Sequence, residues 1–180
     1  DESIGLASLR GPANDVRLWQ KTLKARGVSD IRILADAVEG GVIPTHAAIL
    51  EAMADLARSS SAGDLAIITL SGHGTRQPDN NGDETDGLDE LFLPADTGRA
   101  EAGSNAIPNA LLDDEIGVAV DAIRATGADV WLIIDSCHSG SGLRAASPDV
   151  ASRYVDPALL GVSDRAAGPA ADSGAGDTGR

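Results

Sequence analysis

The chain has 180 residues, of which 42% are hydrophobic and 23% are charged, and its formal net charge at pH 7 is -14. This length and apolar content are sufficient for one domain with a substantial core. The acidic balance argues against nucleic acid as a partner, because phosphates call for clusters of Lys and Arg. It suits a cationic substrate or a bound metal ion, although solubility alone also explains most of an acidic surface.

Helical and strand patterns alternate in the first half of the chain. Apolar residues at helical spacing predict a helix that begins at Pro12 and ends near Arg26. Residues 31–34 are predicted as a short strand, and a second helix is predicted from Pro44 to about residue 59. Residues 65–70 are apolar on both faces, which predicts a buried strand.

The second half continues the alternation after a long polar loop that reaches about Asn109. Residues 91–93 interrupt this loop and are expected to pair briefly as a strand. A third helix is predicted over about residues 113–125, and a strand over 129–134. The βα alternation predicts an α/β fold, with a mainly parallel sheet and helices on both faces.

The two ends and the cysteine content complete this picture. Residues 1–9 contain no convincing strand, and residues 161–180 are rich in Gly, Ala, Asp and Ser. We expect one folded domain over residues 1–160 and a disordered tail over 161–180. Cys137 is the single cysteine, no apolar run approaches the ~20 residues that span a bilayer, and no charged-then-apolar leader opens the sequence. We therefore expect a soluble, cytoplasmic protein with no membrane partner.

Two short segments follow the two apolar strands and carry candidate chemistry. His73 lies in the Ser-Gly-His-Gly segment 71–74, and Cys137 lies in the Asp-Ser-Cys-His-Ser-Gly segment 135–140. Open α/β sheets hold their functional side chains at the carboxyl ends of strands. A thiol needs a base or a lowered pKa to attack an amide, so this pairing predicts a Cys-His peptidase. The alternative is a buried, inert cysteine with a core histidine.

Four segments in this order resemble the metacaspases, the caspase-like cysteine peptidases of bacteria, plants, fungi and protozoa. They are residues 9–16, 71–74, 81–96 and 135–140. The resemblance covers about residues 9–145 and implies a caspase-like sandwich. The family's first strand, expected just before Leu9, is missing, and no small-subunit region follows the cysteine. The sheet would then need strands from elsewhere, including a small-subunit partner, and the chain is either a fragment or a short homologue.

The resemblance implies that Cys137 is the nucleophile and that His73 is the base or the proton donor to the leaving amine. The backbone N–H groups of Gly74 and Cys137 are the best candidates for an oxyanion hole, since donors must surround the developing negative oxygen. Gly72 and Gly74 would let a peptide approach the histidine closely. His138 is expected to face away from the thiol, and a zinc site is disfavoured because no fourth ligand occurs at a recurrent spacing.

Specificity is expected to come from carboxylates near the two catalytic residues. Asp135 precedes Cys137 by two positions, and Ser71 bears the same relation to His73, so each pair shares a face of its strand. Asp15 resembles the third acidic member of the metacaspase specificity pocket, although charge compensation at a helix start also explains it. Carboxylates facing one cavity favour a bound cation, which predicts peptide or protein substrates cleaved after Arg or Lys.

Calcium is the one metal that the sequence suggests. Carboxylates crowd residues 79–96, with no Lys or Arg among them, and hard oxygen ligands suit Ca²⁺. The resemblance implies a site at Asp89, Asp113 and Asp114, with a further carboxylate at the position that Arg144 occupies here. We therefore expect no required cofactor and at most a weak calcium effect, and a solvated acidic loop explains the pattern equally well.

The leading hypothesis is a cysteine endopeptidase that cuts after Arg or Lys and processes itself. Arg144, Arg153 and Arg165 are the candidate sites of self-cleavage. One alternative is a His-Cys peptidase of the same broad fold with another specificity. The other is a non-catalytic caspase-like module that binds partners or regulates a full-length homologue.

Overall fold

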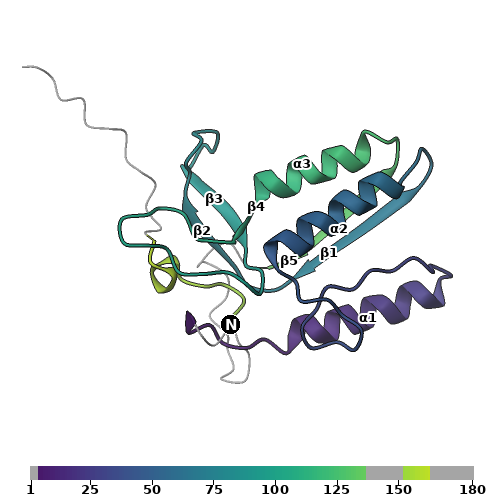
Figure 1. Cartoon of the computed structure of the whole chain (residues 1–180), viewed down its shortest axis with the longest axis horizontal. Helices are drawn as coiled ribbons and strands as arrows, with labels where there is room; N and C mark the ends of the chain where they lie inside the picture. Colours follow the sequence, from purple (N-terminus) through teal and green to yellow (C-terminus); the bar gives the residue numbers. More distant parts are fainter. Residues whose placement is uncertain (1–3, 137–151, 163–180) are drawn as a thin grey trace, which may run out of the picture.

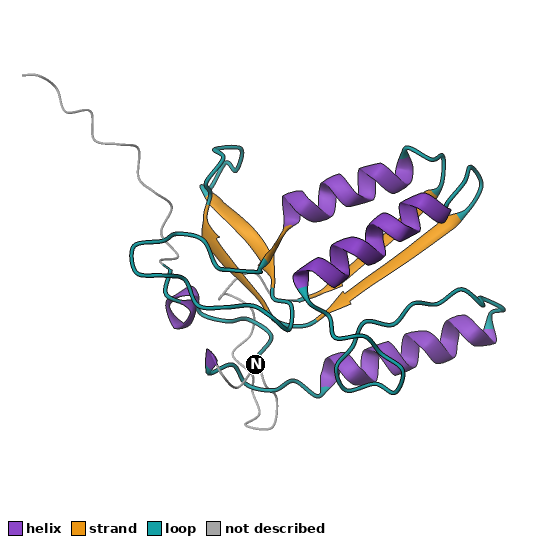
Figure 2. Ribbon diagram, in the orientation of Figure 1, coloured by secondary structure: helices purple, strands orange, loops and turns teal. Residues whose placement is uncertain are grey.

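A computed structural model describes residues 4–136 and 152–162 of the chain. Its centre is a parallel pair of strands, β1 (Leu65–Ser71) and β5 (Asp129–Asp135). The register pairs Ser71 with Asp135, so both strands end at the same edge of the sheet. Helices cover both faces of this pair (Figures 1 and 2), which confirms the α/β fold with a parallel sheet.

Three helices surround the parallel strands: α1 (Gly11–Ala25), α2 (His46–Ser59) and α3 (Asp113–Arg124). Each begins at a local signal in the sequence. Pro12 lies in the first turn of α1, where a missing N–H costs nothing. The Thr45 side chain accepts a hydrogen bond from the Ala48 N–H at 3.1 Å and caps α2. Glu115 accepts from the Leu112 N–H at 3.1 Å and closes the first turn of α3.

The main core lies between the parallel strands and one pair of helices. Figure 2 shows α2 and α3 together on one face, with α1 on the opposite face. Ile68 of β1, Ile49 and Met53 of α2, and Ile116 and Ile123 of α3 belong to this cluster of buried residues. α1 contributes no buried residue to it. The helix that carries Asp15 therefore packs less closely than the other two.

A second, antiparallel sheet lies beyond the carboxyl end of β1. It consists of β2 (Gly74–Pro78), β3 (Leu88–Phe92) and β4 (Leu111–Leu112), in the order β2-β3-β4. This sheet packs on a second apolar cluster, to which the short 3-10 helix η2 (Pro157–Leu160) contributes Leu160. The segment after His73 is therefore held in regular structure.

Several expectations need correction or remain outside the described residues. The predicted polar loop contains β2, which was not expected, and β3, which overlaps the expected strand at residues 91–93 but begins at Leu88. Leu91 and Phe92 bury their side chains where they pair with β4. Residues 31–34 run extended, and within the described part of the chain they form only an isolated bridge, between Leu34 and Val42. Val162 is 5% exposed in the second apolar cluster, and residues 163–180 lie outside the described part. Within the described residues, no helix is both long enough and apolar enough to cross a membrane.

Candidate active site

His73 lies two residues beyond the end of β1 and is half-buried. Its Nε2 is 2.8 Å from the carbonyl oxygen of Ala7, and its Nδ1 is 3.3 Å from the carbonyl oxygen of Arg153. Each ring nitrogen therefore faces a carbonyl oxygen, which only accepts hydrogen bonds. The two contacts orient the imidazole between Ala7 and the segment that contains Arg153.

Cys137 and His138 lie outside the described residues. β5 ends at Asp135, which pairs with Ser71. The chain therefore reaches Cys137 two positions after the same sheet edge from which it reaches His73. Register alone brings the strands that precede the two predicted catalytic residues together.

Asp15, Ser71 and Asp135, the three predicted substrate-binding residues, meet around the guanidinium of Arg153. The Nη2 atom of Arg153 lies 2.8 Å from Oδ2 of Asp15, and its Nη1 atom lies 2.8 Å from Oδ2 of Asp135. Nη1 also donates to the Ser71 hydroxyl at 2.8 Å. We call the group formed by Asp15, Ser71 and Asp135 the acidic pocket; it joins α1, β1 and β5.

Hydrogen bonding inside the acidic pocket favours the ionised form of Asp15. The Ser71 hydroxyl donates to Oδ2 of Asp15 at 2.6 Å. This bond, together with the hydrogen bond from Arg153, lowers the pKa of Asp15 below its ordinary value of 3.8. Gly11 permits the approach of the guanidinium, because a Cβ at Gly11 would lie 3.0 Å from Nη2 of Arg153.

The backbone on either side of Arg153 lies along β2 in parallel pairing. The Gly74 N–H donates to the Arg153 carbonyl oxygen at 2.9 Å, and the Val155 N–H donates to the Gly74 carbonyl oxygen at 2.9 Å. The Thr75 hydroxyl, fully buried, donates to the Val155 carbonyl oxygen at 2.7 Å. The N–H predicted to bind an oxyanion thus binds the carbonyl of the residue whose side chain fills the acidic pocket.

Gly72 has a packing role in addition to the one expected for it. A Cβ at this position would lie 2.9 Å from the ring of Phe92. The absence of a side chain therefore allows the Phe92 ring to pack against the turn before His73. Close packing of this turn is a second reason for the glycine.

The acidic residues predicted to bind calcium lie near the antiparallel sheet. Asp89 is 2% exposed and accepts from Nε2 of Gln77 at 3.1 Å, and burial raises the pKa of Asp89. Its carboxylate groups with those of Asp79 and Asp83, with ligand atoms within 4.8 Å of one another. Burial likewise raises the pKa of Asp113.

Of the remaining positions implied for the calcium site, the structure describes Asp114 and does not describe Arg144. Asp114 accepts from Nδ2 of Asn81 at 2.8 Å. Arg144 lies outside the described residues. Asp79 and Asp83 belong to the carboxylate-rich segment 79–96 that the sequence marked for Ca²⁺, but their grouping with Asp89 was not predicted, because the turn between β2 and β3 brings them together. Hard oxygen atoms from such a group suit Ca²⁺.

The pH dependence of stability tests the acidic pocket. Because the pKa of Asp15 is lowered in the folded state, the ionised carboxylate stabilises the fold above about pH 3.8, and this contribution is lost as the pH falls through the lowered value. We expect Asp15→Asn to lower the thermal midpoint at pH 7 by about 3–6 °C, since a charge-assisted hydrogen bond is weakened. The difference from wild type should shrink as the pH falls below 3.8 through the lowered pKa of Asp15.

Asp121→Asn is the matched control for that experiment. Asp121 is 77% exposed and pairs with Arg124 at 3.6 Å on the surface of α3. We expect a change of less than about 0.5 kcal/mol in the free energy of unfolding at either pH. A midpoint difference for Asp15→Asn that stays equally large from pH 7 down to the acid limit of folding would contradict the assignment, because it would not follow ionisation of Asp15.

Comparisons with known proteins agree on one family. A family profile described as metacaspase, peptidase C14 domain, matches residues 3–146. Metacaspase-4 of Arabidopsis thaliana is 37% identical over 148 residues, which cover 80% of this chain and 32% of that protein. Metacaspase-1B of Aspergillus terreus is 37% identical over 139 residues, which cover 75% of this chain and 35% of that protein.

A solved structure supports the same fold. Protein GSU0716 from Geobacter sulfurreducens aligns with a TM-score of 0.56 and 25% sequence identity, over 80% of this chain and 47% of that one. The chain spans about a third of the length of the curated relatives that it matches. With the profile matching most of its residues, the chain belongs to the metacaspase family of C14 peptidases.

Proposed function

We propose that this chain carries the catalytic centre of a cysteine endopeptidase that hydrolyses peptide bonds after Arg or Lys. The observation that supports it is the position of Arg153. Its guanidinium binds Asp15, Ser71 and Asp135, and its own carbonyl oxygen accepts from the Gly74 N–H. The side chain of Arg153 therefore fills the acidic pocket, and its carbonyl oxygen binds the candidate oxyanion donor. A substrate residue before the scissile bond would make the same two contacts.

The charge of the acidic pocket selects for basic substrates. Two carboxylates converge on one side chain, and a hydroxyl adds a third oxygen. An Asp or Glu side chain in the same place would meet like charges without a compensating cation, which costs several kcal/mol in a partly buried site. The two nitrogen atoms of a guanidinium reach both carboxylates at once, so we expect Arg to be preferred over Lys.

The proposed reaction proceeds through an acyl-enzyme on Cys137. Its thiol transfers a proton to His73, and the thiolate attacks the carbonyl carbon of the scissile bond. The N–H groups of Gly74 and Cys137 stabilise the oxyanion. His73 then protonates the leaving amine as the C–N bond breaks. Water hydrolyses the thioester, with His73 accepting a proton from the water and the thiol being restored.

The same geometry supports self-cleavage at the Arg153–Tyr154 bond. Of the three arginines considered as cut sites, Arg153 is the one within the described residues, and it already lies in the acidic pocket with its carbonyl near His73. Until this bond is cut, Arg153 competes with any other basic side chain for the pocket. Cleavage would free its carbonyl end from the chain that follows and allow it to leave.

We expect purified wild-type protein to convert to a product that ends at Arg153, as measured by intact-mass spectrometry over time. Arg153→Gln should remain uncut at this bond, because a neutral amide cannot pair with both carboxylates. Arg165→Gln is the matched control and should be cut normally. Cys137→Ala should stay intact under all conditions. Cleavage after Arg144 or Arg165 with the Arg153–Tyr154 bond unbroken would contradict the assigned site.

Substrate preference is measured best with the acidic pocket vacated, in an Arg153→Gln background. We expect fluorogenic peptides with Arg before the scissile bond to be hydrolysed, and peptides with Asp to be resistant. Asp135→Ala should lower kcat/KM for the Arg peptide by about 100-fold or more, and that for an Ala peptide by far less, because a paired charge loses its partner. Equal losses for both peptides would argue against a basic-residue pocket.

We further propose that catalysis needs no cofactor and that calcium binds weakly near Asp89, with Asp113 and Asp114 raising the local negative charge. Burial raises the pKa of Asp89, so its ionisation costs the folded state stability as the pH rises above 3.8. We expect Asp89→Asn to raise the thermal midpoint in EDTA and to abolish any calcium-dependent shift. In wild type, calcium should act only at concentrations near 10⁻³ M. Activation at micromolar calcium would contradict this proposal, because a weak site would be almost empty at that concentration.

A further inference from the structure

Gly74 binds the backbone on both sides of the Arg153–Tyr154 bond. Its N–H donates to the Arg153 carbonyl oxygen at 2.9 Å, and its own carbonyl oxygen accepts from the Val155 N–H at 2.9 Å. Together the two hydrogen bonds form a parallel bridge between Gly74 and Tyr154. The first involves the candidate oxyanion donor. The second holds the chain that follows the proposed scissile bond, on the side of the leaving amine.

The segment 153–155 lies along a free edge of β2. This strand pairs with β3 on its other edge. A peptide that adds to a sheet edge is bound through its main chain, and pockets for its side chains give specificity. Pro157 begins η2 and has no N–H, so strand-like pairing with β2 ends after Val155. The contact therefore covers the residue before the proposed scissile bond and the two residues after it.

A buried hydroxyl completes the contact with Val155. Thr75 is 0% exposed, and its Oγ1 donates to the Val155 carbonyl oxygen at 2.7 Å. Another substrate can bind only after segment 153–155 has left, and the Thr75 hydroxyl then loses this acceptor. A buried donor without a partner keeps the full cost of its desolvation. The carbonyl group of an incoming peptide, in the same place, would restore the bond.

The side chain of Val155 fills an apolar pocket next to the candidate base. Val155 is 4% exposed and belongs to the second apolar cluster, together with Leu91 and Leu93. The Leu93 N–H donates to the His73 carbonyl oxygen at 3.0 Å, which ties this part of the cluster to the histidine. An apolar side chain gains free energy on entering such a pocket, whereas a charged one would lose its hydration without gaining a partner.

We propose that β2 binds the substrate chain after the scissile bond and that the enzyme prefers an apolar residue at the second position after the cut. The Gly74 carbonyl oxygen accepts from the N–H of that residue, and the Thr75 hydroxyl donates to its carbonyl oxygen. Its side chain enters the pocket that Val155 fills. This inference rests on the proposed peptidase function and adds a second determinant of specificity to the acidic pocket. Contacts on both sides of the bond also hold it in one orientation for attack.

A purely structural reading assigns Thr75 and Val155 a different role. On that reading, the two residues only anchor segment 152–162 to the fold, and changing them affects every substrate equally. If instead Thr75 binds substrate, its effect depends on whether the substrate has a residue at the second position after the cut. Substrates of different length therefore distinguish the two readings.

The test uses the full 180-residue chain with Arg153→Gln and Val155→Gly, which vacates the acidic pocket and the apolar pocket. Three acylated peptides have Arg before the scissile bond and end after it in Tyr-Val-amide, Tyr-Gly-amide or Tyr-amide. All three keep an amide N–H for Gly74. We expect kcat/KM, measured by chromatography of the products, to be about 10-fold higher for the Val peptide than for the Gly peptide, because a Val side chain is buried.

Thr75→Val tests the hydroxyl in the same background. We expect it to lower kcat/KM about 10-fold for the Val and Gly peptides and to leave the Tyr-amide peptide unchanged, since that peptide lacks the carbonyl group. Thr75→Ser should recover most of the loss. Thr97→Val is the matched control, because Thr97 is 4% exposed and its Oγ1 donates to the Pro94 carbonyl oxygen at 2.8 Å. It should not change the ratios among the three peptides.

Self-cleavage provides a second measurement in a chain that retains Arg153. We expect Val155→Asp to slow cleavage of the Arg153–Tyr154 bond at least about 10-fold, because a carboxylate cannot enter the apolar pocket without losing its hydration. Val155→Ile should be cut at close to the wild-type rate. Intact-mass spectrometry over time gives both rates.

The outcomes separate this inference from the proposed function. Equal kcat/KM for the three peptides, or an equal loss for all three with Thr75→Val, would overturn the inference and leave the peptidase standing. A preference for Val, with a Thr75→Val loss confined to the two longer peptides, would support it. Failure of the folded protein to hydrolyse any of the peptides would refute the peptidase, and the binding role of β2 with it.

Discussion

The ion pairs of Arg153 with Asp15 and Asp135 are the interaction on which the candidate site depends. Two carboxylates that converge on one small space repel each other, and a cation between them converts that repulsion into attraction. Asp15 lies on α1 and Asp135 at the end of β5, so the guanidinium links the helix to the strand. The same contact holds the backbone of Arg153 on Gly74. Pocket charge and backbone position are therefore coupled.

This coupling gives the acidic pocket two states with different requirements. With Arg153 bound, the carboxylates are satisfied within the chain and the N–H of Gly74 is used. Without it, the carboxylates need another cation, and a basic peptide side chain supplies one together with a carbonyl for the same N–H. A basic substrate and Arg153 must then exclude each other. Affinity for substrate is thus reduced by whatever free energy holds Arg153 in place.

Sequence patterns predicted the parts of the structure that depend on neighbouring residues. Alternation along the two apolar strands placed Ser71 and Asp135 on the side of the predicted catalytic residues, and the register of β1 with β5 brings them together. The place of Asp15 in the acidic pocket was predicted from family resemblance, because charge compensation at a helix start would also explain an aspartate at this position. The docking of Arg153 could not be predicted, since its partners lie 138 and 18 residues away and no local pattern marks the contact. β2 was missed for the same reason, whereas part of β3 was predicted at residues 91–93 from its apolar run.

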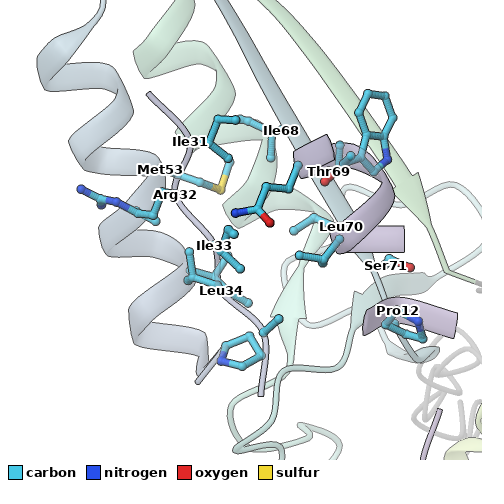
Figure 3. Close-up of a pocket in the computed structure, with 18 of the residues that line it drawn as sticks. Pro12, Ile31, Arg32, Ile33, Leu34, Met53, Ile68, Thr69, Leu70 and Ser71 are labelled. Atoms are coloured by element: carbon cyan, nitrogen blue, oxygen red, sulfur yellow. The ribbon is translucent and has the colours of Figure 1, made fainter. Parts of the chain in front are cut away.

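The extended segment at residues 31–34 shows what a local sequence pattern can and cannot specify. Its apolar run is suited to a sheet, yet among residues 4–136 and 152–162 it forms only one isolated bridge. β-Propensity expresses how well side chains pack on a pleated surface, so a strand without neighbours remains merely extended. A groove of about 1260 Å³ lies beside this segment and is lined also by β1, α1 and α2 (Figure 3), and α1 has no buried residue. Since α1 also carries Asp15, the packing of this helix on the sheet and the geometry that would bind a basic side chain are controlled by one element.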